Sequence, residues 1–118
     1  MFYKVLNIRD LSPSTYILRL ERKKLDFKPG QCFNLGLKGS GINREYSIYS
    51  GVDDSYLEFL IKEVKRGSVS PALRKVKPGD EVALHGPYGA FIISSDRAKK
   101  TLFTFIATGT GIAPFHSF

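Results

Sequence analysis

Four consecutive residues, Arg44, Glu45, Tyr46 and Ser47, place a permanent cation, a carboxylate, an aromatic ring and a hydroxyl close together. The run from residue 42 to 49 has the composition of a β-strand, and alternation along a strand puts Arg44 and Tyr46 on the same side. An aromatic face beside a guanidinium suits a ligand with a flat ring and an anionic group. Taken alone, the four residues favour a plainer interpretation, an edge strand with a surface arginine and a half-buried tyrosine.

A second group, Gly67-Ser68-Val69-Ser70, precedes a helix that the pattern predicts from Ser70-Pro71 to Pro78-Gly79. Serine is a common capping residue and proline suits the first helical position. Unpaired N–H groups at a helix start bind anions, although a plain capped helix explains the same residues. This group and Arg44 flank the strand expected from Tyr56 to Val64. If they converge, they offer what a pyrophosphate needs, and a flavin nucleotide combines a pyrophosphate with a flat ring.

A glycine-rich turn, residues 108–114, follows the apolar run from Thr101 to Ala107. A strand, a Gly-x-Gly turn and then a helix form the general pattern of a dinucleotide phosphate loop. The pattern is weak here, because little of the helix follows. The run is apolar on both faces, which is typical of a parallel, helix-covered sheet. We therefore expect the architecture to change near residue 100.

Other chemistries find little support in the sequence. His85 and His116 have no cysteine or carboxylate at ligand spacing, so we expect no metal site. The basic residues lack the aromatic interleaving of a single-strand nucleic-acid groove, and no apolar stretch reaches 18 residues, so neither nucleic acid nor a membrane is an expected partner. The net charge of +7 favours acidic partners. The single cysteine, Cys32, cannot form an internal disulfide, which favours the reducing cytoplasm.

The elements that must position these groups are mostly strands. With 118 residues the chain is long enough for one domain. Alternation is clearest where Tyr16, Leu18 and Leu20 take one face of a strand. Strands are predicted at residues 2–8, 15–23, 32–38, 42–49, 56–64 and 80–85, with a turn at 86–89. This pattern predicts a mainly β chain with one short helix, a small antiparallel barrel or sandwich over residues 1–99, followed by the beginning of a second domain over residues 100–118.

Six motifs occur in the order and spacing of the ferredoxin–NADP+ reductase superfamily, and the chain most resembles the bacterial ferredoxin/flavodoxin–NADP+ reductases. The motifs are Lys28-Pro29-Gly30-Gln31, Arg44-Glu45-Tyr46-Ser47, Gly67-Ser68-Val69-Ser70, Lys77-Pro78-Gly79-Asp80, Gly86-Pro87-Tyr88-Gly89 and the run from Ala107 to Pro114. The resemblance covers nearly the whole chain. It implies a six-stranded antiparallel Greek-key barrel that holds FAD, followed by an α/β NADP(H)-binding domain of which this chain has the first strand and loop.

The resemblance also implies roles for individual residues. The stretch of residues 44–47 contacts the cofactor. Tyr46 stacks on the isoalloxazine, Arg44 pairs with the phosphates, and Glu45 is a further cofactor-binding residue. Ser47 lies near the reactive N5 edge of the flavin and is the catalytic candidate. Further cofactor contacts fall on the backbone of Leu60, Ile61 and Lys62, on Ser68, Val69 and Ser70 around the pyrophosphate, and on Thr110. The NADP phosphate loop falls on Gly109, Thr110 and Gly111.

The activity that the resemblance implies is electron transfer between NADPH and ferredoxin or flavodoxin through FAD, with FMN a less expected cofactor. Such partners are commonly acidic, which agrees with the positive charge. Two alternatives stay open: the reductase component of an oxygenase or another flavin reductase, using FAD or FMN, and a basic β-barrel binding module without a redox role. The chain ends at Phe118, inside the expected nucleotide domain, so we expect a fragment that does not oxidise NADPH by itself.

Overall fold

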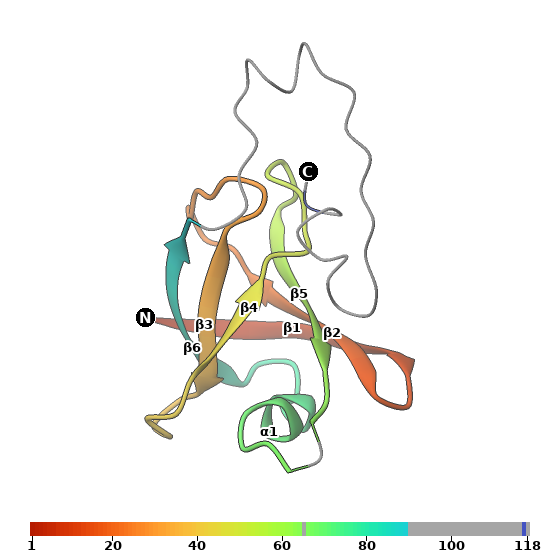
Figure 1. The fold of residues 1–118 in the computed structure, drawn as a ribbon. Coiled ribbons are helices and arrows are strands. Elements are labelled where there is room, and N and C mark those ends of the chain that lie inside the picture. Colours follow the sequence, from red (N-terminus) through yellow and green to blue (C-terminus); the bar gives the residue numbers. More distant parts are fainter. Residues whose placement is uncertain (65, 90–116, 118) are drawn as a thin grey trace.

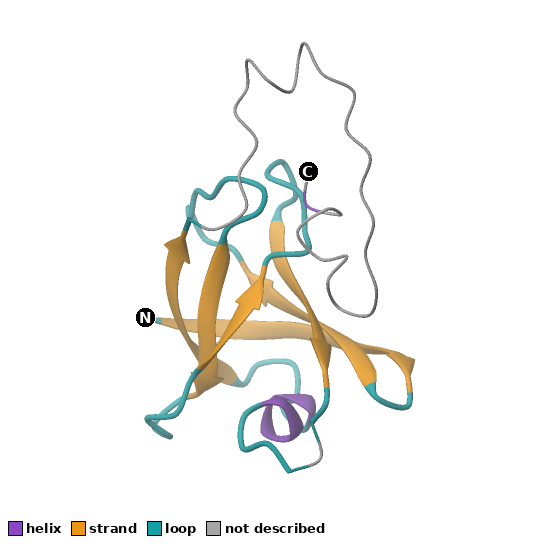
Figure 2. Ribbon diagram, viewed as in Figure 1, coloured by secondary structure: helices purple, strands orange, loops and turns teal. Residues whose placement is uncertain are grey.

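A computed structural model describes residues 1–64, 66–89 and 117 of the chain (Figures 1 and 2). Its strands form one antiparallel sheet in the order β4-β3-β6-β1-β2-β5. The elements are β1 (Phe2–Ser12), β2 (Thr15–Glu21), β3 (Cys32–Leu37), β4 (Arg44–Ser47), β5 (Tyr56–Lys62), α1 (Ser70–Arg74) and β6 (Glu81–Tyr88).

The sheet curls until its two edge strands, β4 and β5, approach one another (Figure 1). Just beyond the end of β4, Ile48 forms an isolated bridge with Phe59 of β5. Beside it the Tyr49 N–H donates to the Glu58 carbonyl at 2.8 Å. The links from β2 to β3 and from β5 to β6 join strands that are not neighbours, as in a Greek key. The predicted mainly β barrel of six strands and one short helix is therefore confirmed.

Alternate side chains of β2 point into the barrel core. Tyr16, Leu18 and Leu20 are fully buried, as the alternation predicted. Their partners on β5 face the same way, with Leu18 opposite Phe59 in the register of the two strands. The Phe59 ring meets Phe33 of β3 edge to face, with ring centroids 5.7 Å apart. Large apolar side chains from opposite walls thus meet at the centre of the barrel.

The prediction of a turn at Gly86-Pro87-Tyr88-Gly89 is wrong in part, because residues 86–88 belong to β6. β6 reaches Tyr88, which pairs with Cys32 of β3, and an irregularity in the register lies between that pair and Asn34–His85. Gly86 has φ near +139°, a conformation that few other residues adopt. Glycine and a local bulge let the strand continue through a sequence that is typical of a turn.

The helix is shorter than expected and begins differently. α1 ends at Arg74, whereas the pattern predicted helix up to Pro78-Gly79. Its N-cap residue is Val69 and makes no side-chain capping bond, so the capping role predicted for Ser70 is wrong. The Ser70 hydroxyl instead accepts a hydrogen bond from the Val64 N–H at 2.8 Å. Leu73 anchors α1 in the core, and the helix covers one end of the barrel (Figure 2).

The expected elements of the second domain, the strand at residues 101–107 and the loop at 109–111, lie outside the described residues. Within the described part, no helix is long and apolar enough to cross a membrane.

Candidate functional site

β4 and β5 lie next to each other in the closed sheet, and we call the region between them on the side of α1 the wedge. The two strands are joined at the bridge between Ile48 and Phe59, and from there they diverge toward α1 (Figure 1). Both are edge strands of the sheet. Within the described part of the chain, β4 therefore pairs only with β3 along its length from Arg44 to Ser47. Within the described residues, no ladder pairs β4 with β5 on the side of α1 beyond this bridge.

The backbone of β5 meets this wedge at alternate residues. The Glu58 carbonyl points toward β4, since it accepts the Tyr49 N–H. Backbone groups of an antiparallel strand point to opposite sides in turn, so Leu60 and Lys62 direct theirs toward β4 as well. Ile61 directs its groups to the β2 side, where it is paired with Tyr16. Of the three β5 residues predicted to contact a cofactor through the backbone, two thus face the wedge.

A cavity of about 260 Å³ occupies the base of the wedge. Its lining joins the two anion-favouring groups of the sequence with the end of β5. The lining residues are Arg44, Tyr46, Lys62, Val64, Gly67, Ser68, Val69 and Ser70. Arg44 and residues 67–70, which a pyrophosphate site requires to lie close together, therefore do so in the fold. Closure of the barrel brings the start of β4 and the end of β5 to the same end of the barrel.

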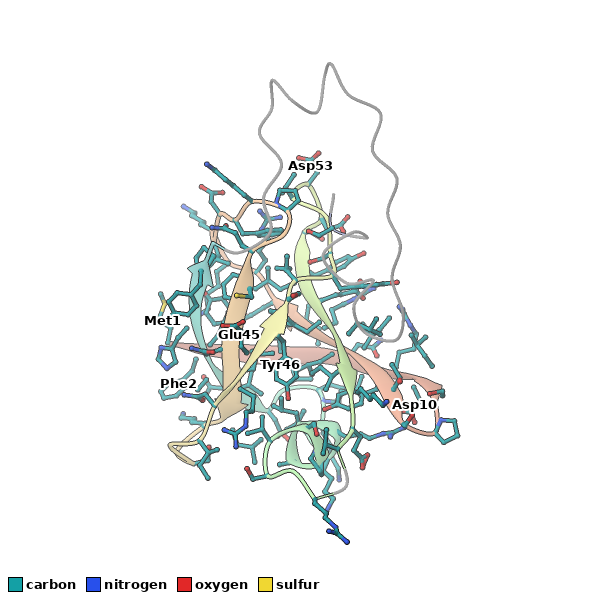
Figure 3. The ribbon with its side chains drawn as sticks, in the orientation of Figure 1. Met1, Phe2, Asp10, Glu45, Tyr46 and Asp53 are labelled. Atoms are coloured by element: carbon teal, nitrogen blue, oxygen red, sulfur yellow. The ribbon has the colours of Figure 1, made fainter. Side chains whose placement is uncertain are left out.

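Two side chains of β4 supply an aromatic face and a charge to this cavity. Tyr46 is half-buried, packs against the core and points toward α1 (Figure 3). Burial raises its pKa while Arg44 lowers it, so the phenol is neutral at physiological pH. Arg44 is exposed and donates to the Asn43 carbonyl at 2.9 Å. No carboxylate of the described residues forms an ion pair with Arg44, so its charge can serve an anionic ligand.

The other two residues of the Arg44–Ser47 stretch do not line the cavity. Glu45 points away from Tyr46 and lies over β3 (Figure 3). It approaches Cys32, whose thiol has a raised pKa, first because of burial and then because of the Glu45 carboxylate. Ser47 is half-buried and pairs with Cys32 in the β3–β4 ladder. The structure therefore brings together only Arg44 and Tyr46 of the predicted four.

Residues 67–70 form the wall of the cavity that faces β4. The Gly67 N–H donates to the Val64 carbonyl at 2.8 Å, which makes a tight turn. A β-carbon at position 67 would lie 3.1 Å from that carbonyl oxygen, so this turn leaves little space for a side chain. Val64, which is exposed and lines the cavity, was not singled out from the sequence. Its position depends on the turn between Val64 and Gly67, which no local pattern indicates.

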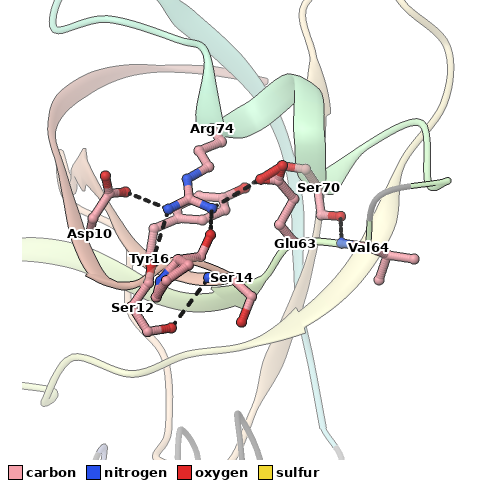
Figure 4. Close-up of polar contacts among 9 residues, drawn as sticks. Asp10, Ser12, Ser14, Tyr16, Glu63, Val64, Ser70 and Arg74 are labelled. Atoms are coloured by element: carbon pink, nitrogen blue, oxygen red, sulfur yellow. Dashed lines mark hydrogen bonds and ion pairs between the residues drawn. The ribbon is translucent and has the colours of Figure 1, made fainter.

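An arginine network holds this wall from behind (Figure 4). The Arg74 guanidinium donates to the carboxylates of Asp10 and Glu63 at 3.1 Å and 3.0 Å. The buried Tyr16 hydroxyl donates to the Ser70 carbonyl at 2.6 Å. Arg74 is the last residue of α1 and was not singled out as a site residue from the sequence. No local pattern indicates these partners, because Asp10 and Arg74 are 64 residues apart.

The chemistry available in the cavity is recognition of an anion and of a ring. Its lining has the cationic side chains of Arg44 and Lys62, one phenol ring and the polar groups of residues 67–70, and it contains no carboxylate. The described residues contain no group of three or more histidine, cysteine or acidic side chains that could hold a metal ion. Thr110, Gly109 and Gly111, the remaining predicted site residues, lie outside the described residues.

Comparison with known proteins finds a matching family model and several relatives. Residues 3–93 match the family model of the oxidoreductase FAD-binding domain. The toluate 1,2-dioxygenase electron transfer component of Pseudomonas putida is 40% identical over 115 residues, which are 94% of this chain and 33% of that protein. The flavodoxin/ferredoxin–NADP reductase of Escherichia coli (strain K12) is 32% identical over 116 residues, 97% of this chain and 47% of that protein.

A solved structure of ferredoxin–NADP+ reductase from Plasmodium falciparum is also similar. It superposes with a TM-score of 0.86 at 30% sequence identity, over 98% of this chain and 48% of that one. The chain thus spans about half or less of the length of the relatives it matches.

Proposed function

The chain belongs to the oxidoreductase FAD-binding domain family, and from this premise we propose that it is the flavin-holding part of an NADP(H)-dependent reductase that passes electrons between NADPH and ferredoxin or flavodoxin. The observation that carries the proposal is the cavity between β4, β5 and residues 67–70, which Arg44 and Tyr46 line together with that turn. FAD, when bound, supplies the hydride and single-electron chemistry.

The residues of the cavity fit a portion of FAD. Ligand pockets commonly measure about 300–1,000 Å³, so a cavity of about 260 Å³ holds part of a dinucleotide, and we assign it the pyrophosphate and the adjoining region. Arg44 and Lys62 provide two cationic side chains for the two negative charges of a pyrophosphate. The absence of carboxylates from the lining removes the main source of repulsion for such a group.

We assign each side chain one task in holding the cofactor. Tyr46 offers its ring face to the isoalloxazine, and Arg44 pairs with the phosphates. The backbone groups of Leu60 and Lys62 that face the wedge are placed to bind the flavin or its ribityl chain. Residues 68–70 provide polar groups for the pyrophosphate from the opposite wall. These tasks are binding and orientation, which is the usual contribution of a protein to cofactor chemistry.

The remaining assignments rest on the resemblance of the motifs. Ser47 is assigned to the neighbourhood of the flavin N5 edge, and Glu45 remains with it as a member of the cofactor-contacting stretch. Gly109, Thr110 and Gly111 are assigned to the NADP phosphate loop, with Thr110 also approaching the flavin. The net charge of +7 supports an acidic electron partner and steering by complementary fields. We place the protein in the cytoplasm, on the single free Cys32.

A second candidate is the reductase component of an oxygenase. One observation favours it: the 40% identity to the toluate 1,2-dioxygenase electron transfer component. Both candidates use the same flavin cavity, and they differ in the protein that receives the electrons.

The absorption spectrum of the purified protein tests the proposal, with chromatography of the flavin released on denaturation. We expect flavin absorption, directly or after addition of FAD, and FAD as the released species. Release of FMN alone would favour another flavin reductase. A colourless protein that takes up neither FAD nor FMN would refute the proposal, and salt-dependent binding of an oligonucleotide by such a protein would favour a basic binding module.

A further inference from the structure

We propose that Arg74 is a positioning residue for the phosphate end of the FAD site, acting through the placement of residues 67–70. The proposal rests on the proposed function, since it concerns the same cavity. Arg74 does not line that cavity. It acts from the far side of α1, where its guanidinium ties the helix to the β1–β2 turn (Figure 4).

The helix cannot hold this position by itself. α1 has five residues and its N-cap makes no side-chain hydrogen bond. Because a helix of so few peptide units has only a small macrodipole, it contributes little positive potential to the cavity. That potential comes from Arg44 and Lys62 in the lining. The wall formed by residues 67–70 is therefore placed by tertiary contacts. One of them is the burial of Leu73 in the core.

The guanidinium of Arg74 supplies the second contact. One terminal nitrogen, Nη1, donates to the Pro13 carbonyl at 2.6 Å and to Glu63 at 3.0 Å. The other, Nη2, donates to Asp10 at 3.1 Å and to the Ser12 carbonyl at 3.2 Å. The acceptors come from the end of β1, the β1–β2 turn and the residue after β5. The planar guanidinium has several N–H donors and can bond all four acceptors at once. The single ammonium group of a lysine cannot match that geometry.

Ser70 connects this network to the cavity. Its carbonyl accepts a hydrogen bond from the hydroxyl of Tyr16, whose ring centroid lies 5.4 Å from the Arg74 guanidinium carbon. Its own hydroxyl accepts the Val64 N–H, which fixes the turn that leads into the wall. Ser70 and Val64 both line the cavity. A shift of α1 away from the β1–β2 turn would therefore move the wall relative to Arg44.

Loss of the network should affect the phosphates and leave the ring contact largely intact. The Tyr46 ring is carried by β4, which is paired with β3 on the other side of the cavity. Riboflavin has the flavin ring without phosphates, so it depends on Tyr46 and little on residues 67–70. The ratio of FAD affinity to riboflavin affinity then measures the placement of the phosphate wall, separately from general stability.

The test is the Arg74→Met variant of the 118-residue chain, with FAD and riboflavin affinities measured by isothermal titration calorimetry. We expect FAD affinity to fall on the order of tenfold, the effect of about one lost hydrogen bond to a charged group, and riboflavin affinity to change less than about twofold. Arg74→Lys should restore only part of the loss, because lysine replaces the charge without the fork. An unchanged ratio in a folded Arg74→Met variant would overturn the proposal.

The matched control is Arg19→Met. Arg19 also donates two hydrogen bonds to a barrel carboxylate, Glu58, at 3.0 Å and 2.9 Å, and its guanidinium lies over the Tyr56 ring. It lies outside the cavity lining. We expect this variant to lower stability and to keep the FAD to riboflavin ratio of the parent. An equal fall of the ratio in both variants would assign the effect to general loosening and overturn the proposal.

A second variant decides the matter if Arg74→Met does not fold. Tyr16→Phe removes the hydrogen bond to the Ser70 carbonyl and retains the ring in the core. It should lower the same ratio, by a smaller factor, and an unchanged ratio would overturn the proposal. Failure of the proposed function looks different, because the parent chain itself would then bind neither FAD nor riboflavin. A parent that prefers FAD, with variants that keep this preference, refutes the role of Arg74 alone.

Discussion

Replacing Arg44 with alanine tests whether the cavity between β4 and β5 binds the phosphates of FAD. The side chain is exposed, and its hydrogen bond to the Asn43 carbonyl is the only side-chain hydrogen bond or ion pair that it makes within the described residues. Its removal should therefore cost the fold little, since surface substitutions usually change stability by less than about 0.5 kcal/mol. Any large change in ligand affinity can then be assigned to the ligand contact.

The size of the effect follows from the type of contact. A hydrogen bond to a charged group contributes about 1.5–3 kcal/mol, and about 1.4 kcal/mol corresponds to a factor of ten. We expect FAD affinity to fall about 10- to 150-fold in Arg44→Ala. Riboflavin has no phosphate to lose, so its affinity should change less than about twofold. FMN, which has one phosphate, should lie between the two.

Calorimetric titration of the parent and the variant with the three flavins measures these changes. Lys24→Ala is the matched control, because Lys24 is an exposed cation outside the cavity lining and its loss changes the net charge equally. This control should leave the ranking of the three flavins unaltered. An equal loss of FAD and riboflavin affinity in Arg44→Ala, or an equal loss of FAD affinity in both variants, would refute a phosphate contact at Arg44.

Three further predictions follow from the same structure. Tyr46→Ala should weaken FAD and riboflavin binding alike and alter the fluorescence of the bound flavin while the barrel stays folded, and parental affinity for both would contradict stacking. Gly36→Ala should lower the free energy of unfolding by about 1–3 kcal/mol in urea titrations, because a β-carbon there overlaps the Ile42 carbonyl just before β4, and an unchanged midpoint would show that the strand adjusts freely. Tyr16 has a raised pKa, first from burial and then from Tyr46 and Glu63, so above about pH 10 its unfolded form loses a proton that the folded form keeps. Stability should fall as pH rises through that range, more steeply in the parent than in Tyr16→Phe, and equal slopes would disprove the shift.

Much of the barrel could be predicted because strand burial is a local property. The alternation of Tyr16, Leu18 and Leu20 assigns a core face within one strand, and the fully buried side chains agree with it. The limits of elements were harder to predict. Gly86 and Pro87 are typical of a turn, yet pairing with β3 keeps them in β6. Pairing energy from a neighbouring strand is a tertiary effect that local propensity does not contain.

By itself, the sequence determined the class of the fold, the family and the two groups suited to a ring and a phosphate, since each of these rests on residues close together in the chain. Only the tertiary structure decided which of them meet. Closure of the barrel puts Arg44 and Tyr46 beside residues 67–70, while the alternation of β4 turns Glu45 and Ser47 away from the cavity. It also decided that Arg74 joins Asp10 across 64 residues. Contacts between residues so far apart depend on the register of the whole sheet, and local residue patterns do not determine that register.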